Sequence, residues 1–106
     1  MNCRIMRMIV FFDLPTLTNQ NRTDYRKFRK FLLKNGFIMM QESVYSKLVI
    51  SGNSANLLKT KIKDNLPPSG IVELLQITEK QFASIDYLVG KSQSLVIDSD
   101  NRLVEI

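Results

Sequence analysis

The order of apolar segments along the chain constrains its fold more than any other sequence feature. Between residues 4 and 78, runs rich in β-branched and aromatic residues alternate with amphipathic ones in the order strand, helix, strand, strand, helix, strand. This order predicts the ferredoxin-like βαββαβ plan, an α+β fold in which two helices cover one face of a four-stranded antiparallel sheet. The 106 residues, 44% of them hydrophobic, suffice for one such domain with its own core.

Turn and cap residues set the predicted limits of each element. The predicted strands span 4–12, two parts of 37–50 divided near Gln41 and Glu42, and 71–78, and the predicted helices span 20–35 and 54–66. Gly36 ends the first helix, and a Pro-Pro-Ser-Gly run ends the second. A ferredoxin-like domain is therefore expected over residues 1–78.

The C-terminal tail, residues 79–106, has weaker patterns. A helical turn is predicted at 79–84, a short strand at 85–89 and two further short strands within 94–106. We expect these tail strands to pack on a sheet edge, either that of the same chain or that of a partner.

The first predicted strand has two different faces. Met6, Met8, Val10 and Phe12 share a fully apolar face, and the other face carries Ile5, Arg7, Ile9, Phe11 and Asp13. Since both helices lie on one side of the sheet, the second face is left open. An apolar open face in a small domain needs a cover, and we expect a second copy of the chain to provide it, giving a homodimer through the open sheet face.

The first predicted helix carries charge of one sign. Its basic residues form an unbroken arc opposite its apolar side chains; they are Arg22, Arg26, Lys27, Arg29, Lys30 and Lys34. The segment 22–34 holds six basic residues and one acidic residue, so its charge of +5 equals the net charge of the whole chain. The rest of the chain has nine basic and nine acidic residues and is neutral. A solvated helix face usually mixes both signs, so the arc favours phosphate binding, and two arcs on one dimer suit an extended duplex.

Asp13 follows the first strand and belongs to its open face. Two copies of Asp13 would therefore approach each other in a homodimer, and paired carboxylates repel unless a proton or a divalent cation lies between them. Mg²⁺ accepts one or two carboxylates and keeps waters that can attack a phosphodiester. An aspartate before a Leu-Pro turn is also ordinary loop chemistry, so the residues alone leave both interpretations open.

Tyr45 shares a predicted strand face with Lys47, where a nucleobase could stack on it, although a tyrosine of the core or of an interface has the same pattern.

One cysteine and no histidine exclude a Cys/His zinc site, an internal disulfide and the usual general base. No run approaches the roughly 20 apolar residues of a membrane span. We expect a soluble, cytoplasmic protein without a membrane partner.

Three motifs in order carry a resemblance to a known family. "RMIVFFDLP", the basic helix ending in "FLLKNGF", and "QESVYSKL" resemble the CRISPR-associated Cas2 family of adaptation proteins, over residues 4 to about 78. The run "YRKFRKFLLKNGF" is most similar to the form found in systems with a single large RNA-guided nuclease.

The resemblance implies a homodimer of ferredoxin-like domains that binds DNA. It also implies an integrase partner, two dimers of which join one dimer of this chain to insert captured DNA into a repeat array. Several family members are described as metal-dependent endonucleases acting on RNA or duplex DNA, which implies Mg²⁺ as cofactor.

The resemblance also assigns individual residues. Asp13 matches the family's catalytic, metal-binding aspartate, and Tyr45 an aromatic position that is commonly phenylalanine. The family's phosphate-binding basic residues match Arg22, Arg26, Lys27, Arg29 and Lys30. Phe12 stands where many members have tyrosine, so this chain lacks that hydroxyl.

Three functional hypotheses follow. The leading one is a dimeric DNA-binding scaffold in CRISPR spacer acquisition. The second, compatible with the first, is an endonuclease that works through paired Asp13 and Mg²⁺. The alternative to both is a generic ferredoxin-like module that binds RNA or regulates another protein.

Overall fold

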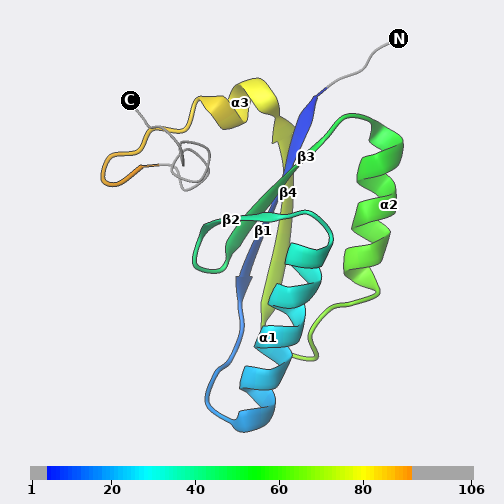
Figure 1. The fold of residues 1–106 in the computed structure, drawn as a ribbon, viewed down its shortest axis with the longest axis vertical. Coiled ribbons are helices and arrows are strands. Elements are labelled where there is room, and N and C mark those ends of the chain that lie inside the picture. The colour runs from blue at the N-terminus through cyan, green and yellow to red at the C-terminus, as the bar shows by residue number, and fades with distance from the viewer. Residues whose placement is uncertain (1–4, 92–106) are drawn as a thin grey trace.

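The architecture is that of a ferredoxin-like domain followed by one short helix. The computed structural model describes residues 5–91. Its elements, in chain order, are β1 (Met6–Asp13), α1 (Asn19–Lys34), β2 (Ile38–Gln41), β3 (Val44–Val49), α2 (Gly52–Lys63), β4 (Ile71–Thr78) and α3 (Glu79–Ala83). The predicted βαββαβ order is confirmed (Figure 1).

The four strands form one antiparallel sheet in the order β2-β3-β1-β4. β1 is central, since it pairs with β3 on one side and with β4 along its whole length on the other. The long helices α1 and α2 both pack on the same side of this sheet (Figure 1). The core between these two layers consists mainly of Met8, Val10 and Phe12 of β1, Phe28 and Leu32 of α1, and Ala55, Leu58 and Ile62 of α2.

Local chemistry explains where α1 begins and ends. Thr18 caps its first turn, because the Thr18 hydroxyl accepts from the backbone N–H of Asn21 and the Asn21 side chain accepts from the backbone N–H of Thr18. At the other end Gly36 has a φ of +89°, a left-handed conformation that glycine adopts without strain. These two signals fix the length of the basic helix.

The open face of the sheet is only partly covered. Ile9 and Ser46 are buried there, with 5% and 2% of their surface exposed. The large apolar side chains around them remain exposed: Ile5, Ile38, Leu48, Ile71 and Leu75. The predicted apolar open face is thus present in the single chain, and the homodimer expected to cover it stays a prediction.

The short helix α3 is attached to one end of the open face. The Arg7 guanidinium donates two hydrogen bonds to the Glu79 carboxylate, at 2.9 and 2.7 Å, and lies 4.2 Å from the ring centroid of Phe82. The backbone N–H of Glu79 also donates to the Ile5 carbonyl. The compact unit therefore continues beyond the predicted boundary at residue 78.

The tail prediction was correct in one part and wrong in another. The helical turn predicted at 79–84 is α3. The strand predicted at 85–89 is absent, because these residues pair with no strand among those the structure describes. The strands predicted within 94–106 lie outside the described residues. Within 5–91, no helix has both the length and the apolar composition needed to cross a bilayer.

The Arg7–Glu79 pair gives the first testable prediction. Arg7 is 16% and Glu79 36% exposed, so solvent screens the pair only in part. A double-mutant cycle of Arg7→Met and Glu79→Gln is expected to give a coupling energy of about 1 kcal/mol in urea unfolding. Hydrogen exchange of the α3 amides should accelerate in both single variants. A coupling energy near zero would show that α3 is held by its other contacts alone.

Candidate nucleic-acid interface

The cations of α1 lie where the sequence predicted them. Phe28 and Leu32 face the core, and the opposite side of the helix carries five exposed basic residues. We call this set the basic face of α1; it consists of Arg26, Lys27, Arg29, Lys30 and Lys34. Arg7–Glu79 is the only ion pair within residues 5–91, so no acidic side chain in that range forms an ion pair with the basic face.

Arg22 has a different environment from the other five cations. Its guanidinium donates to the backbone carbonyls of Thr16, at 2.9 Å, and Leu17, at 3.3 Å, and to the side-chain oxygen of Asn19. Arg22 therefore ties the β1–α1 connection to the first turn of α1. The sequence pattern placed Arg22 in the arc, but it could not show these loop carbonyls.

Tyr45 is a core residue, and the stacking role considered for it is wrong. Only 1% of its surface is exposed, and it pairs across the sheet with Val10 on the face covered by the helices. Its ring stacks on Phe12 with centroids 5.6 Å apart. Burial raises the pKa of the Tyr45 hydroxyl, and the charge of the nearby Arg29 opposes that rise in part. A nucleobase has no access to this ring.

Asp13 ends β1 with an exposed side chain on the open face. It pairs with Ile71 of β4, and on the other side of β1 the backbone N–H of Phe12 donates to the Ser43 carbonyl. Leu14, the next residue, turns back into the core with 9% exposure. The end of the strand is thus held from both sides, and the carboxylate is left accessible.

A close backbone contact holds the loop before β4 against Asp13. Gly70 has a φ of +97°, and a β carbon built on it would lie 2.7 Å from the Asp13 carbonyl oxygen and 2.7 Å from Leu14 Cδ2. Only glycine fits this approach without a shift of the backbone. In the sequence Gly70 is recognisable only as a helix breaker, and its contact with Asp13 appears only in the fold.

Gly70→Ala is expected to destabilise the protein by about 2–3 kcal/mol, because the substitution combines a disfavoured positive φ with a backbone clash. For a domain of this size that loss lowers Tm by roughly 10 °C or more. Differential scanning calorimetry measures it. Gly52→Ala is the matched control, since nothing lies within 4 Å of its β carbon and its φ is not positive. An equal change in both variants would contradict the role of Gly70.

Asp13 offers one accessible carboxylate to a hydrated divalent cation, which is part of a metal site and not a complete one. Within residues 5–91 no group of three or more His, Cys, Asp or Glu side chains could hold a metal ion together. Mg²⁺ needs fewer protein ligands, because it binds through one or two carboxylates and retains several waters. One accessible carboxylate per chain meets that requirement if a second copy supplies the other.

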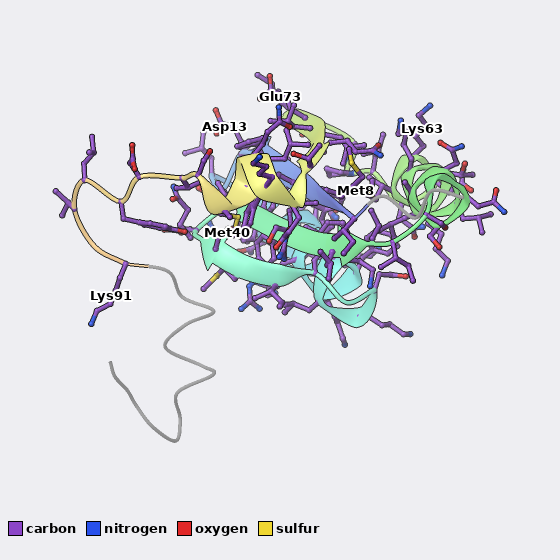
Figure 2. All side chains as sticks on the ribbon, turned by 90° about the horizontal axis from the view of Figure 1, so that it is seen from above. Met8, Asp13, Met40, Lys63, Glu73 and Lys91 are labelled. Atoms are coloured by element: carbon purple, nitrogen blue, oxygen red, sulfur yellow. The ribbon has the colours of Figure 1, made fainter. Side chains whose placement is uncertain are left out.

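Glu73 is a further acid on the open face, and no sequence motif marks it. It pairs with Phe11 and is therefore a diagonal neighbour of Asp13 across the β1–β4 pair. Figure 2 shows Asp13 and Glu73 on the same side of the molecule, with Lys63 of α2 at a distance from both. The alternation of residues in β4 indicates that Glu73 lies on the same face as Ile71 and Leu75. Only the register between β1 and β4 shows that Glu73 lies beside Asp13.

Comparison with known proteins agrees with this architecture. The family model described as "CRISPR associated protein Cas2" matches residues 6–85. A protein of Treponema denticola named "CRISPR-associated endoribonuclease Cas2" is 50% identical over 99 residues, which are 93% of this chain and 98% of that protein. A protein of the same name from Streptococcus mutans is also 50% identical over 99 residues, covering 93% of this chain and 91% of its own length.

A solved structure supports the fold independently of sequence similarity. The structure described as "Crystal structure of cas2" superposes with a TM-score of 0.57 at 21% identity, covering 85% of this chain and 92% of that chain. At this identity the likeness concerns the fold alone. The stretch matched by the family model contains both Asp13 and the whole of α1.

Proposed function

This chain belongs to the CRISPR-associated Cas2 family, and we propose that it acts in spacer acquisition as a homodimeric scaffold that holds duplex DNA. Its partner in this proposal is a CRISPR integrase, two dimers of which are bridged by one dimer of this chain. The complex inserts captured foreign DNA into the repeat array.

The basic face of α1 is the observation that carries this proposal. Its five exposed cations share one side of a rigid helix, and the described part of the chain offers no acidic side chain paired with any of them. Lys and Arg side chains in such a row bind backbone phosphates and position a duplex, but they do not distinguish one base sequence from another. A scaffold for captured DNA needs this property, because captured fragments differ in sequence.

The open face of the sheet supports the homodimer. Exposed Leu48, Ile71 and Leu75 are costly to leave in water, and a second copy would bury them. A twofold axis through this face would also present two basic faces on one body. Size-exclusion chromatography with light scattering measures the mass, and a monomer at micromolar concentration would contradict this part of the proposal.

Array expansion tests the scaffold role directly. Cells that carry the integrase and a repeat array, with or without this chain, are scored for newly inserted fragments. We expect insertion only when the chain is present and recovery of both proteins together on affinity purification. Recovery with ribosomes or mRNA and never with the integrase would support the alternative, a generic RNA-binding or regulatory module.

Endonuclease activity is a second candidate function, favoured by the names of the relatives and by the accessible Asp13. In this proposal paired Asp13 carboxylates hold Mg²⁺, and the basic face binds the phosphates of RNA or duplex DNA. The cation would supply a bound water of lowered pKa as the attacking group. Asp13 would be the catalytic residue, since its carboxylate positions that cation.

A further inference from the structure

A small pocket lies beside the basic face of α1 and has a chemistry that phosphate binding does not explain. It has a volume of about 230 Å³ and lies between α1 and the loop that joins α2 to β4. Its walls combine apolar side chains, among them Phe31, Leu66 and Pro67, with the polar side chains of Asp24, Lys27 and Asn65. Lys27 thus belongs both to the pocket and to the basic face.

The size of the pocket restricts what it can hold. Sites for drug-sized ligands usually occupy about 300–1,000 Å³, so this pocket accepts one planar ring system rather than a whole nucleotide. An aromatic wall beside a row of cations suits an unpaired base that leaves its phosphate on the helix surface. A duplex lying on α1 would not fill it, because its bases are stacked inside.

The polar side chains leave two acceptors and one ammonium group available. One Asp24 carboxylate oxygen accepts from the Gln20 side chain at 2.9 Å, and the other has no recorded partner within 5–91. The Asn65 side-chain nitrogen donates to the Lys61 carbonyl at 2.8 Å, which leaves the Asn65 oxygen as an acceptor. Asp24 and Lys27 form no recorded ion pair with each other.

Asp24 is the only acid in the segment 22–34. A surface that bound only phosphates would be weakened by it, since a carboxylate repels a polyanion. A nucleobase edge that donates hydrogen bonds, in contrast, requires acceptors of this kind. Guanine offers two adjacent donors, N1–H and the 2-amino group, beside the O6 acceptor that Lys and Arg side chains bind. Adenine, cytosine and uracil each lack part of this set.

We propose that the pocket between α1 and the α2–β4 loop binds an unpaired guanine base. The available Asp24 oxygen accepts from its N1–H group, the Asn65 side-chain oxygen accepts from its 2-amino group, Lys27 donates to O6, and Phe31 contacts the ring. The inference rests on the proposed nucleic-acid binding by α1 and deepens it: the basic face holds the strand, and the pocket selects single-stranded positions that carry guanine.

Titration of the full chain with nucleoside monophosphates tests the pocket. The 5′-monophosphates of guanosine, inosine, adenosine, cytidine and uridine are added separately while amide NMR shifts are followed. We expect the guanosine compound to bind at least about tenfold more tightly than the adenosine, cytidine and uridine compounds, as a pair of hydrogen bonds to one base edge provides. The largest shifts should fall on Phe31, Asn65 and Leu66. The inosine compound, which lacks the 2-amino group, should bind with intermediate affinity.

Asp24→Asn is the decisive variant, because asparagine still accepts from Gln20 but presents an N–H group to guanine. We expect the preference for the guanosine compound to fall to within about twofold of the others, while the circular dichroism spectrum is unchanged. Gln20→Ala is the matched control, since it removes the local hydrogen bond and should leave the preference intact. Equal affinities in the unmodified protein, with shifts confined to the basic face, would overturn the proposal.

Duplex binding, measured in parallel, separates this inference from the proposed function. Binding of duplex DNA without any preference among the monophosphates would contradict the guanine pocket alone. A guanosine preference in a protein that binds no duplex would support the pocket and contradict the scaffold.

Discussion

The double variant Arg26→Glu with Lys30→Glu is expected to bind duplex DNA about 100-fold more weakly at 0.1 M salt. Each chain loses two phosphate contacts and gains two charges that repel the backbone. The slope of log affinity against log salt should become shallower by about 2 for each chain bound. Fluorescence anisotropy with a labelled duplex at several salt concentrations measures both quantities.

The matched control for this variant changes the net charge of the chain by the same amount, but on a different helix. Lys59→Glu with Lys63→Glu reverses two cations of α2 and should reduce the affinity by no more than a few-fold, through the weaker overall field. An equal loss in both double variants would indicate that net charge, and not the basic face of α1, determines binding.

Asp13→Asn is expected to reduce metal-dependent cleavage of RNA by at least about 100-fold. Loss of a group in the outer shell of a metal site already costs 10–100-fold, and the proposed ligand itself should cost no less. The fold should be unaffected, because the Asp13 side chain is exposed and asparagine has nearly the same shape. Cleavage of an end-labelled oligoribonucleotide with excess protein and Mg²⁺ measures the effect, and anisotropy without Mg²⁺ should show unchanged binding.

Asp64→Asn provides the control for Asp13→Asn, because it removes one exposed negative charge at the C-terminal end of α2, away from the open face. It should leave the cleavage rate within a few-fold of the original. Cleavage that survives Asp13→Asn would contradict the nuclease proposal. Array expansion that also survives it, by contrast, is the result expected of a scaffold that does not depend on hydrolysis.

The sequence was sufficient to predict the fold because its signals are local. The residues of β1 that alternate toward the helices form the core as expected, and Gly36 ends α1 near the predicted position. The second helix starts earlier than predicted, since Ser51 caps it through the backbone N–H of Ser54. The β4 limits, Ile71–Thr78, match the prediction.

The parts that could not be predicted depend on contacts between distant segments. The apolar residues 85–89 have the composition of a strand, but a strand also needs a neighbour with free backbone groups. Tyr45 faces the core because of its register with Val10, which no single strand pattern contains. The pocket beside α1 could not be predicted either, because its walls come from two segments that meet only in the fold.

The salt dependence of duplex binding by the unmodified chain tests the central claim most directly. If the basic face of α1 lies against nucleic-acid phosphates, binding releases counterions, and log affinity falls linearly with log salt. Five exposed cations per chain predict a slope of about −4 or steeper. An affinity that stayed constant between low and high salt would contradict the account.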